Sequence, residues 1–413
     1  MAKRRQMGGG SNGCGQSVSS QSPPSEFYTP LLVKMPPSDL NASIAKVQND
    51  FALKLLREFA AFYGNASACI SPPAVAVTLA LTLSGAKDKT SDQLSQVLAK
   101  GTPKYRILPH FGALLNLLHG GGKKYAKFTV ESVCKLCLKS DIALSDAFKA
   151  SLDKYFGAHL ELVDFGENMK QVLATTAKVN KIVLDASHGA VKEILKPELF
   201  NAQTNLLLLS AFYFKGKWVE KFDPDLTQKR AFFVGPTEQK EVYMMQKTHF
   251  FDYYDDNSVQ LLAMHCDEAS MYLALPKERF GLANFLANLT VDSLFEMAQK
   301  CRKVKLNVAV PKIKLDQTVE LNEPLKKLGL VNVFENANFQ AIAADVPSLS
   351  VSKVLQKAVL EIDEQGGHDD SMSEAGLISP TSPPLKFVAD HPFAIFVVSQ
   401  TQQTIVLTGI YQG

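Results

Sequence analysis

The sequence predicts an α+β domain, because helical patterns come first along the chain and strand patterns follow. The 413 residues are 46% hydrophobic and 21% charged, an ordinary globular composition that is sufficient to bury a large core. Apolar residues recur with helical spacing over residues 44–62. Ser71, followed by two prolines, is placed to cap a second helix over residues 72–81. Helical stretches dominate to about residue 200, interrupted by a strand over residues 128–138.

Strand patterns take over in the second half of the chain, where branched and aromatic residues are common and apolar residues alternate. The predicted strands cover residues 204–213, 241–251, 259–264, 269–275, 303–315, 357–364 and 387–396. We expect them to form a largely antiparallel sheet system.

The last two predicted strands are separated by a segment rich in glycine, serine and proline. A loop of roughly 20 residues inside a compact domain is uncommon and is usually functional or disordered. Because predicted strands flank it closely on both sides, we expect this loop to be displayed on the surface.

The first 40 residues are rich in Gly, Ser, Pro and Gln, which predicts a disordered tail ahead of a single domain over residues 41–413. Two glycine patterns within residues 8–13 match nucleotide-binding and nucleophile motifs, but neither follows a predicted strand, as both motifs require. The basic start has no apolar segment behind it. We therefore expect a cytoplasmic or nucleocytoplasmic protein, with an extracellular location as the alternative.

Composition gives no support to several other classes of function. A net charge of +3 is too near neutral to indicate nucleic-acid or membrane binding, and no window approaches the roughly 18 apolar residues of a membrane span. The six cysteines are expected to be reduced and mostly buried. Cys134 and Cys137 have metal-site spacing, but residues three apart on a strand face opposite ways. We expect no metal, no cofactor and no enzymatic activity.

Several short motifs follow one another along about residues 45–413. The most specific are residues 212–218 and residues 387–393. The others are residues 49–52, 71–72, 84–94, 163–165, 179–181, 244–245, 311–312 and 325–334. Taken in this order, the motifs resemble the serpin family, the serine protease inhibitor superfamily, and residues 387–393 are similar to the family's C-terminal signature.

The resemblance implies three β-sheets, eight or nine helices and an exposed reactive-centre loop near the C-terminus. In inhibitory members a protease cleaves this loop, which then inserts into the large sheet as a new central strand and carries the acylated protease with it. Insertion of the loop is driven by a metastable sheet, whose strand edges gain hydrogen bonds when the loop enters.

The resemblance places this loop at about residues 364–384, with Glu364 and Gly366 at its start. Inhibitory members continue with a small hydroxyl residue and a run of alanines, whereas this chain has Gly367, His368 and Asp369. On an inserted strand Asp369 would face the core, which costs several kcal/mol or forces the carboxylate to take up a proton.

The scissile region is expected near four residues of this loop, Leu377, Ile378, Ser379 and Pro380. The loop has no Lys or Arg between Gln365 and Leu385, which disfavours a trypsin-like target and leaves elastase-like and chymotrypsin-like enzymes.

The family's shutter, a polar network beneath the centre of the large sheet, maps to Ser71, Ala74, Ser210 and Gln356. Only Ser71 is retained, because Ala74, Ser210 and Gln356 replace serine, asparagine and histidine. Gln356 can still donate and accept, so we expect the network to be rewired. Trp218 maps to the breach at the top of the large sheet, where we expect it to serve as a packing residue.

These departures predict a monomeric serpin with weak or absent inhibitory activity that acts by binding a protease or another protein. The alternative is a suicide-substrate inhibitor of an elastase-like or chymotrypsin-like serine protease, or of a cysteine protease. Lys123, Lys124 and Lys127 offer a weak polyanion site, although lysines in a glycine-rich turn usually form a solvated loop.

Overall fold

The computed structural model describes residues 40–118, 128–157, 159–216, 218–219, 221–266, 269–346, 348–365 and 383–413. Residues 1–39 of the predicted N-terminal tail and the lysines Lys123, Lys124 and Lys127 lie outside these residues. Most of the predicted reactive-centre loop also lies outside them.

The described residues form nine α-helices, which agrees with the predicted number. They are α1 (Leu40–Tyr63), α2 (Pro72–Gly85), α3 (Asp88–Ala99), α4 (Lys104–Leu118), α5 (Asp146–Tyr155), α6 (Met169–Ala186), α7 (Leu282–Asn288), α8 (Val291–Lys300) and α9 (Asn322–Lys327). None of these helices is long and apolar enough to cross a membrane.

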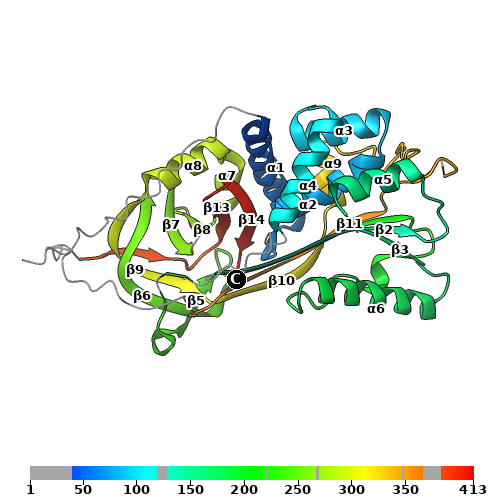
Figure 1. The fold of residues 1–413 in the computed structure, drawn as a ribbon. Helices are drawn as coiled ribbons and strands as arrows, with labels where there is room; N and C mark the ends of the chain where they lie inside the picture. Colours follow the sequence, from blue (N-terminus) through cyan, green and yellow to red (C-terminus); the bar gives the residue numbers. More distant parts are fainter. Residues whose placement is uncertain are drawn as a thin grey trace, which may run out of the picture. The chain divides into compact units, whose positions relative to one another are not determined.

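A five-stranded sheet has the order β10-β11-β4-β2-β3. Its strands are β10 (Ile313–Glu320), β11 (Lys353–Ile362), β4 (Leu206–Gly216), β2 (Phe128–Lys139) and β3 (Leu160–Val163). Figure 1 shows α6 on one side of this sheet and α2 on the other. Each helix packs on its own buried cluster, so both faces of the sheet are covered.

A nine-stranded sheet holds the other strands. They are β1 (Ala68–Ile70), β5 (Gln228–Phe233), β6 (Gln239–Asp255), β7 (Val259–Cys266), β8 (Ala269–Pro276), β9 (Arg302–Pro311), β12 (Leu385–Val388), β13 (Phe393–Ser399) and β14 (Thr404–Tyr411). The three expected sheets are therefore two hydrogen-bonded sheets among the described strands. The reason is that β6 is 17 residues long, pairing with β5 near its start and with β7 near its end.

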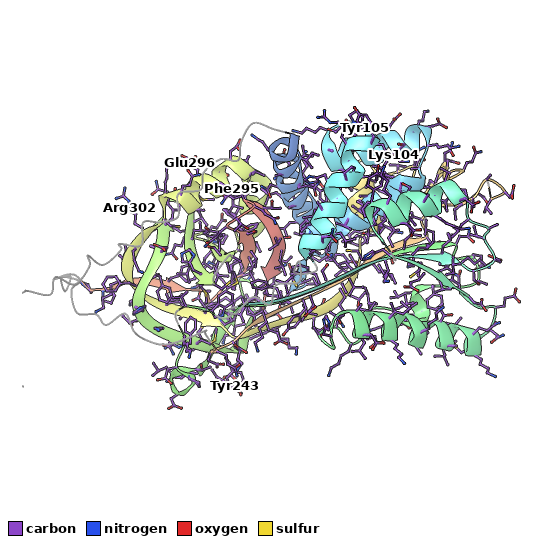
Figure 2. The ribbon with its side chains drawn as sticks, in the orientation of Figure 1. Lys104, Tyr105, Tyr243, Phe295, Glu296 and Arg302 are labelled. Atoms are coloured by element: carbon purple, nitrogen blue, oxygen red, sulfur yellow. The ribbon has the colours of Figure 1, made fainter. Side chains whose placement is uncertain are left out.

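Two predicted strands are each divided in the structure. The prediction over residues 303–315 is wrong in extent, because β9 and β10 belong to different sheets and the chain changes sheet at Lys312. There the Lys312 N–H donates to the carbonyl of Tyr243, which is exposed on β6 (Figure 2). The prediction over residues 387–396 divides into β12 and β13, because Pro392 has no N–H to donate to a sheet.

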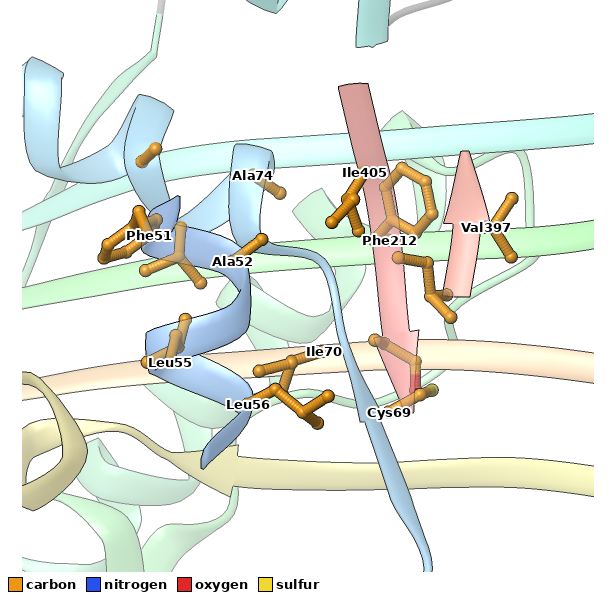
Figure 3. Packing of buried hydrophobic residues seen from close by; sticks show 14 of the residues in the cluster. Phe51, Ala52, Leu55, Leu56, Cys69, Ile70, Ala74, Phe212, Val397 and Ile405 are labelled. Atoms are coloured by element: carbon orange, nitrogen blue, oxygen red, sulfur yellow. The ribbon is translucent and has the colours of Figure 1, made fainter. Parts of the chain in front are cut away.

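Helix α2 is buried along its whole length, as its apolar sequence on all sides predicts. Its two threonines satisfy their hydroxyls within the helix, since Thr78 and Thr82 donate to carbonyls of the preceding turn. Ser71 is the N-cap residue, as predicted, and its Oγ donates to the carbonyl of Val406 on β14 and not to an N–H of the helix. Helix α2 is thereby joined to the nine-stranded sheet, and Figure 3 shows Ala74 in this packed core.

Candidate functional site

The candidate site is the parallel pairing of β4 with β11, which we call the seam. It runs from the pair Lys353–Leu207 to the pair Glu361–Lys215. The predicted loop begins just beyond the end of β11. A loop that turns back from this end runs antiparallel to β11, and therefore also to β4, so it can pair with both once they separate.

Gln356 links both sides of the seam at its middle. Its Oε1 accepts from the Ser71 N–H at 2.9 Å, and its Nε2 donates to the Ser71 carbonyl at 3.0 Å and to Ser210 Oγ at 3.1 Å. Gln356 and Ser71 are 0% exposed and Ser210 is 1% exposed. One amide side chain thus joins β11, β4 and the start of α2 in a buried, fully hydrogen-bonded arrangement.

Ala74 contributes only its main chain to this region, because it has no hydroxyl. Its carbonyl accepts from Thr78 Oγ1 at 3.4 Å and from Cys134 Sγ at 3.5 Å. The structure therefore brings Ser71, Ser210 and Gln356 into one hydrogen-bonded set and leaves Ala74 beside it.

Cys134 is a member of the site that sequence reasoning missed. It pairs with Ser210 across β2 and β4, and Ser210 pairs with Gln356, so the three side chains form a row across the sheet. Burial raises the pKa of the Cys134 thiol to about 12. Cys134 packs on the α2 side and Cys137 on the α6 side, which confirms that they face opposite ways. Only the pairing between strands far apart in the sequence could have placed Cys134 beside Ser210 and Gln356.

Charged side chains surround the loop-side end of the seam. Lys215 Nζ on β4 lies 2.9 Å from Asp363 Oδ2 and 3.6 Å from Glu361 Oε2. Lys314 on β10 approaches the other oxygen of Glu361 at 2.9 Å. Lys215 thus bridges the two strands that flank the seam, and Glu361 carries the connection on to β10.

Glu364, the predicted start of the loop, is held by two side chains. Lys312 Nζ lies 2.7 Å from Glu364 Oε2, and Thr227 Oγ1 donates to Oε1 at 3.0 Å. Burial disfavours the ionised forms of Glu361 and Glu364, yet the neighbouring lysines hold the pKa of each carboxyl below its ordinary value. The hydrogen bond to Asp363 correspondingly raises the pKa of Lys215.

Trp218 lies just beyond the end of β4 and is 0% exposed. Its ring covers Gly216, where an added Cβ would come within 2.5 Å of the indole, and its centroid is 6.5 Å from that of Phe214. The indole N–H has no hydrogen-bond partner among the described residues. Trp218 is therefore a buried packing residue at the loop-side end of the five-stranded sheet, which contains β4.

The other predicted loop residues lie outside the described part of the chain and stay predictions. They are Gly366, Gly367, Asp369, Leu377, Ile378, Ser379 and Pro380.

Comparison with known proteins agrees with this arrangement. Serpin B6 of Pongo abelii is 28% identical over 379 residues, which cover 90% of this chain and 99% of that protein. The leukocyte elastase inhibitor of Sus scrofa is 29% identical, over 87% of this chain and 96% of that protein. The fold of uncleaved ovalbumin matches with a TM-score of 0.80 at 23% identity, covering 90% of this chain and 100% of that one. A family model described as Serpin (serine protease inhibitor) matches residues 46–412, and this chain belongs to the serpin family.

Proposed function

We propose that this serpin inhibits proteases weakly or not at all and acts by binding a protein partner. The observation that carries the proposal is the buried Gln356, which is hydrogen-bonded to Ser210 across the seam and to Ser71 beneath it. We also propose that it is a monomer without enzymatic activity.

Inhibition requires that β4 separates from β11 before the trapped protease completes hydrolysis. Separation breaks the bond between Gln356 and Ser210 while Ser71 keeps Gln356 in place, and it also parts Lys215 from Glu361 and Asp363. A hydrogen bond contributes about 1 kcal/mol net, and each 1.4 kcal/mol added to a barrier slows a step about tenfold. Partly exposed ion pairs add about 0–1 kcal/mol, so the hydrogen bond and the ion pairs of Lys215 together slow insertion by roughly 5-fold to 30-fold if none is replaced in the transition state.

The expected loop composition supports the same proposal. Asp369 would face the core of the sheet after insertion, and an unpaired buried carboxylate is costly. Gly366 and Gly367 lower strand propensity where the inserted strand would begin. A slow insertion lets the protease leave a nicked serpin behind.

The alternative is a suicide-substrate inhibitor of an elastase-like or chymotrypsin-like serine protease, or of a cysteine protease. One observation favours it. In the described residues β4 and β11 pair directly with each other, so the central position in the sheet is still available to an inserting strand. The similarity to a protein named leukocyte elastase inhibitor points the same way.

The two functions are separated by incubation with elastase-like and chymotrypsin-like proteases, followed by a denaturing gel. We expect a nicked chain and little covalent complex. The control is a variant with the family's shutter residues, Ala74→Ser, Ser210→Asn and Gln356→His together, which should form more complex. Covalent complex from the unmodified chain at near-equal stoichiometry would overturn the proposal.

For location, we propose a cytoplasmic or nucleocytoplasmic protein. The five described cysteines are free and buried, which fits a reducing compartment. Asn65 and Asn288 each begin an Asn-x-Ser/Thr glycosylation sequon. Recovery of the protein from culture medium with glycans on either residue would establish the extracellular alternative.

A further inference from the structure

A second polar network lies beyond the seam, on strands of the nine-stranded sheet. His265 on β7 has both ring nitrogens engaged: Nδ1 is 2.8 Å from Ser270 Oγ on β8, and Nε2 is 2.9 Å from Asp252 Oδ2 on β6. Gln400, just after β13, donates from Nε2 to Ser270 Oγ at 2.7 Å. The network therefore joins β6, β7, β8 and the turn that follows β13.

Ser270 accepts from Gln400 and shares its remaining hydrogen-bonding capacity with His265 Nδ1. Asp252 is a carboxylate and can only accept, so the Nε2–H of His265 donates to it. That hydrogen bond holds the pKa of Asp252 below its ordinary value, which keeps the carboxylate ionised. Lys303, Tyr272 and Cys301 are the other titratable groups that interact with members of this network.

A serine, a histidine and an aspartate that are hydrogen-bonded one to the next resemble a hydrolase triad, but this set is not a nucleophilic site. Ser270 is 1% exposed, so no substrate can reach its hydroxyl. The arrangement instead fixes the position of His265 from both sides.

The main chain of His265 is hydrogen-bonded to the segment that contains Trp218. Its carbonyl accepts from the Val219 N–H at 3.0 Å. Val219 directly follows Trp218, whose buried ring covers Gly216 at the end of β4. His265 thus holds the segment that packs the loop-side end of the seam.

We propose that Asp252, His265 and Ser270 form a latch that fixes the Trp218 segment and thereby restrains the loop-side end of β4. The fixing of the segment stands on its own contacts. The restraint on β4 rests on the proposed role of the seam.

The chain contains a single tryptophan, so its fluorescence reports on this segment alone. We expect Asp252→Ala to shift the emission to longer wavelength and to raise quenching by acrylamide. The fraction of molecules in which the Trp218 segment is released should increase about 10-fold, because a hydrogen bond to a charged group is lost. The matched control is Asp390→Ala, which removes the carboxylate 2.7 Å from His391 Nδ1 and should leave the fluorescence unchanged.

Circular dichroism establishes that each variant is folded, and Gln400→Met provides a milder change if Asp252→Ala does not fold. Unchanged quenching in a folded latch variant would overturn the fixing of the segment. If β4 is released, the loop should insert into the seam faster on warm incubation, and the protein should gain resistance to denaturant sooner than the wild type. Increased quenching without this faster gain would overturn the restraint on β4. Both readouts are independent of the gel assay for covalent complex, so this inference and the proposed function can fail separately.

Discussion

The middle of the seam and its loop-side end are closed by different chemistry. In the middle, a neutral amide joins β11 to β4 and α2, and its carbon, nitrogen and oxygen atoms are out of contact with water. At the loop-side end, Lys215, Glu361 and Asp363 hold the same strands together with side chains that are 28%, 21% and 18% exposed. The two sets also lie on opposite faces of β11, because residues 356 and 361 differ by an odd number.

This difference decides which set resists opening more strongly. Water can replace the partners of a partly exposed ion pair, so such pairs contribute about 0–1 kcal/mol. A buried donor or acceptor that loses its partner costs about 1–3 kcal/mol, since no water reaches it. We therefore infer that Gln356 is the main restraint on the seam and that the charged residues are a weaker one.

The largest effect is expected from Gln356→Ala. It leaves the N–H of Ser71 and the hydroxyl of Ser210 without their partner, while the Ser71 carbonyl keeps the N–H of Val75, so the free energy of unfolding should fall by about 3 kcal/mol. Denaturant titration measures this change. Gln365→Ala, which alters an exposed glutamine just beyond β11, is the control and should change stability by less than about 0.5 kcal/mol. Equal effects of the two variants would show that the bonds of Gln356 contribute no more to stability than an exposed side chain does.

A smaller effect is expected from Lys215→Met, which keeps the length of the side chain and removes the charge at the loop-side end. The free energy of unfolding should fall by about 1 kcal/mol or less. Because salt screens exposed charges, the difference from the wild type should shrink in high salt. A loss as large as that of Gln356→Ala would show that the charged end is the main restraint.

The smallest effect concerns the dependence of stability on pH. The pKa values of Glu361 and Glu364 are depressed in the folded state, so their contribution is present above the unfolded pKa of roughly 4.3 and is lost as pH falls through the folded values. The denaturation midpoint should therefore decrease between about pH 5 and pH 3, and less steeply in the variant Glu361→Gln with Glu364→Gln. An identical slope in this double variant would contradict the assignment.

The sequence predicts some of these features well and misses others for a physical reason. Strand alternation was sufficient to place Cys134 and Cys137 on opposite faces, and Ser71 with the two prolines after it correctly marked the start of α2. The resemblance to serpins placed Gln356 in one network with Ser71 and Ser210, but the residue pattern alone could not do so, because these residues lie 285 and 146 positions away along the chain. The same holds for His265 and Asp252, which meet only because β6 and β7 pair in one register. The change of sheet at Lys312 leaves almost no trace in the hydrophobic pattern.

The central claim is that the seam does not open readily, and nicking the loop tests it most directly. The melting temperature is measured before and after cleavage between about Met372 and Pro380. An inserted strand would complete the ladder between β4 and β11 and stabilise the fold greatly. We predict little or no rise in melting temperature for the wild type, and a clear rise when Ala74→Ser, Ser210→Asn and Gln356→His are combined. A large rise in the nicked wild type would contradict the account.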